Sequence, residues 1–356
     1  MPRETGPQSN GPEKPLFSTI LRCPACGEKA TQRLVKAHLV LAVPVPGKPF
    51  HRAFAWMQGT AGGNTSPLYH GICVCPECRY PGIESDFREA GDRAPVGQAL
   101  RRLFAEKGAG LRAPLAAILG PFPETEPEPD RAVRLTLGAI AAQQMIYPEY
   151  WRLPVLARLY LRLTWLYLDE LHLAWKGDGH DLLEGWHERG PGHDRFEAVL
   201  AKLAPVREAW RNMPLNEELA RRHALRLHQK VYDVRQDIPQ PEELVAEERL
   251  LAELYGLNGD LYQAAEMFGR ALDSCLRLRE EAYELHQTAW DRGLTISEVR
   301  VLATRVHRMG LLADEINLQA NRTCGAQPRD IPRIRPLGVT AGLDDDEMHR
   351  QKVGIF

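Results

Sequence analysis

The sequence predicts a mainly α-helical protein with a small N-terminal β module that a metal ion holds together. Three observations support this prediction. Two Cys-Pro-x-Cys motifs lie within residues 16–92, a region dense in Cys, Gly and Pro with short β-like runs. Apolar residues then recur with helical periodicity over most of residues 130–325. Between them, residues 121–129 alternate proline with acidic residues, a pattern that can neither continue a helix nor bury a face.

Composition restricts the classes of function. The chain has 356 residues, of which 44% are hydrophobic and 26% charged, and its formal net charge of -2 gives no global attraction to nucleic acid or membranes. Residues 1–15 contain no apolar run typical of a secretory signal, so we expect a cytoplasmic protein. The most apolar stretch, residues 153–175, is interrupted by charges and predicts a buried core helix, with no membrane partner.

The chain is longer than one typical domain, which predicts two folded units with flanking segments. Asp130 is placed to cap the first helix after the linker. The expected parts are a disordered N-terminus at 1–15, a zinc-binding module at 16–92, a connecting helix at 93–120, an acidic Pro-rich linker at 121–129, a helical domain at 130–325 and a disordered tail at 326–356.

The two Cys-Pro-x-Cys motifs predict one structural Zn²⁺. Each motif is a tight turn that directs two thiolates at one point, and zinc accepts a tetrahedron of four sulfurs. The expected ligands are Cys23, Cys26, Cys75 and Cys78. Residues 27–74 separate the two pairs, which is longer than in compact zinc modules but allowed if a hairpin or loop intervenes. The alternative is two unrelated turns with free thiols.

Other nearby residues could replace a zinc ligand. Cys73 would share a strand face with Cys75, so it could bind the ion or pack beside it, and we expect packing. His51 and His70 are further substitutes, although a lone histidine is more often a surface or hydrogen-bonded residue. With four protein ligands the ion has no position for water, so we expect a structural role, and chelation should unfold this region.

The helical body contains one segment with the spacing of a tetratricopeptide repeat, in which small and aromatic residues face each other across two helices. Its residues are Leu251, Ala252, Tyr255, Gly259, Asp260, Ala264, Phe268 and Ala271. The alternative is an ordinary helical hairpin. A long antiparallel pair should follow, over residues 261–290 and 295–324, with a capping box formed by Thr295 and Glu298.

Three further clusters have a structural and a functional interpretation. An aromatic stripe at Trp165, Tyr167, Leu171 and Trp175 is expected to be core, not a ligand site. A basic stretch is either a solvated face or a groove that binds an acidic peptide, and comprises Arg207, Arg211, Arg221, Arg222, Arg226 and Lys230. A polar connection could supply acid–base groups, and comprises His180, Asp181, Glu184, His187, Glu188 and His193.

The motifs resemble a bacterial family of uncharacterised proteins, domain of unknown function 2225. That family has two Cys-Pro-x-Cys knuckles, a Pro-Leu-Tyr lead before the second and an aromatic residue after it. The matching residues are Cys23, Cys26, Pro67, Leu68, Tyr69, Cys75, Cys78, Tyr80 and Phe87, and the resemblance extends over roughly two-thirds of the chain to residues 163–167 and 253–259. The resemblance implies a bacterial cytosolic protein with a zinc-ribbon-like module. It does not indicate an activity, because the family has none assigned.

The sequence departs from the family's pattern at two places. Arg79 stands where the family has a glycine after the second knuckle, at a position that often needs a positive φ, so we expect strain there. Residues 49–54 replace a charged segment of the family.

Three functions remain open on the sequence. The first is a non-enzymatic scaffold whose helical surface binds a protein or peptide partner, and such binding should survive deletion of residues 1–120. The second is nucleic-acid binding through the zinc module: residues 1–112 hold 15 Lys and Arg against 9 Asp and Glu, about +4 after the metal site is included. The third is an enzyme, for which no phosphate loop, nucleophile elbow or dinucleotide fingerprint is present.

Overall fold

The computed structural model describes residues 14–45, 48–57, 66–88, 95–107, 109–120, 128–144, 152–168, 171–172, 187–188, 213–234 and 241–331, with residues 201, 203, 206 and 210.

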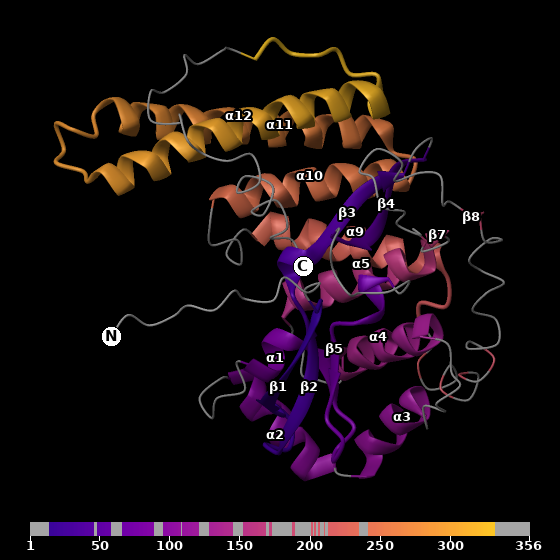
Figure 1. Ribbon diagram of the computed structural model, residues 1–356. Coiled ribbons are helices and arrows are strands. Elements are labelled where there is room, and N and C mark those ends of the chain that lie inside the picture. The colour runs from indigo at the N-terminus through magenta and orange to yellow at the C-terminus, as the bar shows by residue number, and fades with distance from the viewer. Residues whose placement is uncertain are drawn as a thin grey trace, which may run out of the picture.

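Within these residues, the N-terminal region is built from antiparallel β-hairpins (Figure 1). The strands are β1 (Leu16–Arg22), β2 (Lys29–Val35), β3 (Val40–Val45), β4 (Lys48–Trp56), β5 (Ile72–Val74) and β6 (Pro81–Ile83). They pair as β1–β2, β3–β4 and β5–β6. A further short pair joins β7 (Leu171–His172) to β8 (His187–Glu188).

The rest of the described chain is mainly helical, which confirms the predicted fold class. The helices are α1 (Glu84–Arg88), α2 (Pro95–Lys107), α3 (Ala109–Leu119), α4 (Glu128–Gln144), α5 (Leu153–Leu168), α9 (Glu217–Val234), α10 (Pro241–Leu257), α11 (Leu261–Gln287) and α12 (Ile296–Cys324). They form a stack that ends in the α11–α12 hairpin, with α10 and α9 beneath it and α5 and α4 further along (Figure 1). Among the described helices, none is long and apolar enough to cross a membrane.

Two hydrophobic cores lie along this stack. The first is continuous from the four motif cysteines through α4 and α5 to α9, and contains Leu137, Ile140 and Tyr160. The second lies between α10, α11 and α12, around Leu251 and Phe268. The metal module therefore packs directly onto the helical body.

The β3–β4 hairpin explains the long separation between the two cysteine pairs. It extends from the metal module towards α10 (Figure 1), and Phe50 on β4 joins the second core. A Cβ added to Gly256 on α10 would lie 2.2 Å from the Phe50 ring, so only glycine leaves room for this contact. One turn earlier, the buried Glu253 accepts hydrogen bonds from Arg52 of β4. The hairpin thus joins the two cores.

Several helix ends differ from the sequence prediction. The helix expected over residues 153–175 ends at Leu168; Trp165 and Tyr167 are buried core residues as expected, whereas Leu171 is in β7 and Trp175 lies outside the described residues. Helix α4 begins at Glu128, so Asp130 lies in its first turn and is not its cap. An acidic side chain there still favours the helix because it faces the positive end of the helix dipole.

The predicted hairpins at the C-terminal end are confirmed in their local detail. Gly259, with φ of 80°, makes the turn after α10, and the Asp260 side chain caps α11 by accepting from the Gln263 N–H. Thr295 and Glu298 form the predicted capping box at the start of α12. Ala264, Phe268 and the other small and aromatic residues of this segment are buried between helices, except for the partly exposed Tyr255. Whether these hairpins are tetratricopeptide repeats stays an interpretation.

Candidate metal centre

The two cysteine motifs fold into turns with the same backbone hydrogen bonds. In the first turn, between β1 and β2, the Gly27 N–H donates to the Cys23 carbonyl and the Cys23 N–H to the Glu28 carbonyl. In the second, between β5 and β6, the Arg79 N–H donates to the Cys75 carbonyl and the Cys75 N–H to the Tyr80 carbonyl. Each turn therefore presents its two thiols from the end of a hairpin.

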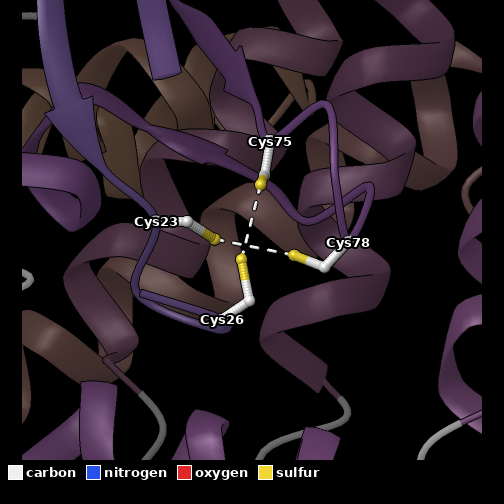
Figure 2. A group of neighbouring side chains, drawn as sticks. All are labelled: Cys23, Cys26, Cys75 and Cys78. Carbon is white, nitrogen blue, oxygen red and sulfur yellow. Dashed lines mark hydrogen bonds between the residues drawn. The ribbon is translucent and has the colours of Figure 1, made fainter. Parts of the chain in front are cut away.

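The four thiols converge on one point (Figure 2). The Cys23 and Cys78 sulfurs are 3.6 Å apart, the Cys26 and Cys75 sulfurs are also 3.6 Å apart, and all four lie within 4.8 Å of one another. Sulfurs about 2.3 Å from a central ion in a tetrahedron are roughly 3.8 Å apart, so these separations fit one ion. The predicted residues are thus brought together from two segments distant in sequence, and they could hold one metal ion.

The charges of the thiols depend on one another. Contact with the Cys23 and Cys78 thiols lowers the pKa of Cys75, because they stabilise its thiolate. The pKa of Cys23 rises to about 12, mainly through Cys75, and that of Cys78 rises, mainly through Cys23. Four thiolates this close repel one another unless a cation compensates their charge. A divalent ion bound by four sulfurs fits the chemistry of these donors.

Arg79 shows how the second turn differs from the first. Gly27 has φ of 82° and Arg79 has φ of 63°, so the residue after each cysteine pair is left-handed. At Arg79 the resemblance to the family implied this conformation. Only glycine adopts this conformation without strain. The Arg79 guanidinium donates a hydrogen bond of 2.6 Å to the carbonyl of Gly120, at the end of α3. This contact ties the turn to the helical body and offsets part of the strain.

Two of the three alternative ligands, Cys73 and His70, are not part of the cluster of four sulfurs. Cys73 is buried on β5, where burial raises its pKa to about 12, and this agrees with the expected packing role. His70 packs beside Trp56, with ring centroids 6.1 Å apart, and burial together with nearby arginines lowers its pKa to about 4. His51 belongs to β4, but its side chain lies outside the described residues.

Two contacts that support the site were missed by sequence reasoning. The buried amide of Gln32 on β2 donates 3.0 Å to the Val74 carbonyl and accepts 3.3 Å from the Val74 N–H, which links the two hairpins next to Cys75. The partly buried Arg162 on α5 donates to the carbonyls of Leu68 and His70 in the segment that leads into β5. A polar residue within an apolar pattern is the only signal for such contacts, and it does not name the partner.

The other predicted clusters are only partly described. Arg222, Arg226 and Lys230 lie exposed on one face of α9, and Arg222 pairs with Glu218. Arg221 is partly buried and pairs with Glu217, whereas Arg207 and Arg211 lie outside the described residues. A groove for an acidic ligand therefore stays a prediction. In the polar connection, His187 and Glu188 are in β8, and His180, Asp181, Glu184 and His193 lie outside the described residues.

Comparison with protein-family models, curated proteins and solved structures found no match. The resemblance to the uncharacterised bacterial family stays a prediction.

Proposed function

We propose that the protein is a non-enzymatic interaction scaffold, in which one structural Zn²⁺ orders the N-terminal module and the helical stack presents a surface to a protein partner. The four cysteines support the choice of zinc, because this ion favours tetrahedral sulfur ligation. If all four thiolates bind, no position is left for a water or substrate, which favours a structural ion. The proposal places the protein in the cytoplasm of a bacterium, where thiols stay reduced.

The observation that carries the proposal is the outer surface of α12. Terminal helices of stacked helical proteins normally have a polar outer face, because nothing covers them. On α12, four aliphatic side chains are instead exposed: Ile296 by 61%, Val301 by 64%, Leu311 by 46% and Leu318 by 48%. Leu311 and Leu318 are seven residues apart and so share one face of the helix. Exposed apolar groups of this kind support a protein-binding surface.

The test compares three full-length proteins by quantitative affinity capture from a bacterial lysate. The double variant Leu311→Glu/Leu318→Glu charges the proposed surface, and Ile20→Glu is the matched control because Ile20 is 67% exposed on β1 of the metal module. We expect the double variant to lose partners that the wild type and the control retain. If all three proteins retain the same partners, this surface does not bind them and the proposal fails.

The other two functions suggested by the sequence gain no support from the described residues. A nucleic-acid role predicts binding that weakens steeply with salt, and an enzyme predicts a phenotype when His187 and Glu188 are replaced together.

A further inference from the structure

The chain that follows α12 turns back along the last helical hairpin. After Gly325 ends α12 in a left-handed conformation, residues 326–331 run along α11 and α12 on the side away from α10 (Figure 1). These six residues belong to the tail that the sequence predicts to be disordered. Their contacts with the hairpin show that its outer side can hold an extended segment.

The segment is held mainly through its backbone. The Asn317 side chain of α12 donates 2.7 Å to the Arg329 carbonyl and accepts 2.9 Å from the Arg329 N–H, so one amide pairs with both backbone groups of one residue. One turn later, the Asn321 side chain donates 2.9 Å to the Ala326 carbonyl. Residues four apart share one helix face, so the two asparagines form a row. Backbone pairing of this kind recognises extended peptides whatever their sequence.

Two side-chain contacts add selectivity. The Arg329 guanidinium forms an ion pair with Asp273 of α11. A Cβ added to Gly269, one turn before Asp273, would lie 3.3 Å from an Arg329 nitrogen, so the glycine leaves space for the guanidinium. Ile331 is partly buried against the second hydrophobic core. The hairpin thus contacts an arginine of its own chain and, two residues later, an aliphatic side chain.

We propose that this side of the α11–α12 hairpin is a binding site for an extended peptide of a partner protein that carries an arginine and, two residues later, an aliphatic residue, and that residues 326–331 occupy the site within the same chain. Asn317 and Asn321 bind the peptide backbone, and Asp273 binds the arginine. Both side chains of the ion pair between Arg329 and Asp273 are exposed to solvent. Exposed ion pairs are weak, so a partner peptide can displace the internal segment.

Occupation by a tethered segment competes with any free peptide. A segment joined by a short flexible connection is present at an effective concentration on the order of millimolar, which lowers the apparent affinity for a competitor. Removing the Arg329 side chain from the internal segment should therefore open the site.

The experiment measures fluorescence anisotropy of a labelled synthetic peptide with the sequence of residues 325–332. Full-length Arg329→Ala should bind it about two- to fivefold more tightly than the wild type, which is the range that loss of an exposed ion pair from the internal competitor allows. Adding Asp273→Lys to this variant should weaken binding at least about fivefold, because the pair is lost and a like charge faces the arginine, and a peptide with glutamate in place of arginine should restore it. Adding Asn317→Ala should weaken both peptides. Circular dichroism and thermal unfolding report whether each variant is folded.

The matched control adds Asp291→Lys to Arg329→Ala, because Asp291 is an exposed acid in the turn of the same hairpin. This control should bind the arginine peptide as Arg329→Ala does. No binding by folded Arg329→Ala up to about 1 mM peptide, the order of the effective concentration, overturns the site. Equal losses from Asp273→Lys and Asp291→Lys overturn recognition of the arginine by Asp273. Neither outcome bears on the Leu311 and Leu318 surface, which is tested separately.

Discussion

The ion pair between the partly buried Arg52 and the buried Glu253 should contribute strongly to the stability of the joint between the metal module and the helical body. Glu253 is 3% exposed, and Arg52 donates to both of its carboxylate oxygens, with 2.8 Å from Nε to Oε2. Removing one partner of a buried pair costs about 3–5 kcal/mol, because a charge is left buried alone. Here Arg249 at 3.5 Å and Gln319 at 3.0 Å would still contact Glu253. We therefore expect Arg52→Met to lower the free energy of unfolding by about 2–3 kcal/mol.

The effect should depend on pH with a defined sign. Burial favours the neutral form of Glu253, but Arg52 and Arg249 more than offset it and hold its pKa below the ordinary value of 4.5. The stabilisation from this pair is therefore present above about pH 4.5 and is lost as the pH falls below it. In Arg52→Met the burial dominates, Glu253 becomes easier to protonate, and the difference from the wild type should shrink between pH 7 and pH 4.

Urea denaturation of the full-length protein at both pH values measures this difference. Arg222→Met is the matched control, because its partner Glu218 and Arg222 itself are more than half exposed. Exposed pairs contribute about 0–1 kcal/mol, so the control should change little at either pH. If Arg52→Met resembles this control at pH 7, or if its deficit does not shrink in acid, the ion pair does not stabilise the joint as we reason.

Three further predictions concern the metal, the joint and the last hairpin. Metal analysis of the purified protein should find about one zinc per chain, and Cys78→Ser should lose it; retention of zinc by this variant would contradict the four-sulfur site. Gly256→Ala places a Cβ against the Phe50 ring and should lower the free energy of unfolding by about 1–3 kcal/mol, as measured in urea, whereas an unchanged midpoint would show that Phe50 does not pack there. Thr295→Ala removes the cap of α12 and should cost about 1 kcal/mol by the same assay; a loss well above about 2 kcal/mol would mean that Thr295 does more than cap the helix.

Features set by residues close in sequence could be predicted, and features set by distant contacts could not. The two Cys-Pro-x-Cys turns and the capping box at Thr295 each follow from a few neighbouring residues, and the positive φ at Arg79 was implied by the glycine that the resembled family has at this position. Convergence of the two turns on one site could also be predicted, because four cysteine thiolates in two pairs typically bind one structural zinc ion. In contrast, Phe50 reaches α10 across about two hundred residues of chain, and no local pattern names that partner.

The helix ends show the same limit. Apolar periodicity alone predicted a helix over residues 153–175, but α5 ends at Leu168, and residues 171–172 pair as a strand with residues 187–188. Pairing partners in a sheet are set by tertiary structure, which overrides a helical pattern at its end. Likewise, the segment after Gly325 lacks periodicity, yet Asn317 and Asp273 hold it on the hairpin. Contacts of this kind need a preformed surface and leave no trace in the segment itself.

The shared core changes how the metal module should be tested. The sequence predicts that the module is a separate folded unit. Deletion of residues 1–120 should then leave a helical body that still binds its partner. In the structure, Leu137 and Ile140 of α4 belong to the same core as the motif cysteines, and Phe50 fills a position in the second core. Deletion would expose both surfaces, and a loss of binding would then report misfolding. Single substitutions such as Leu311→Glu and Asp273→Lys leave both cores intact, so they separate a binding surface from the fold that supports it.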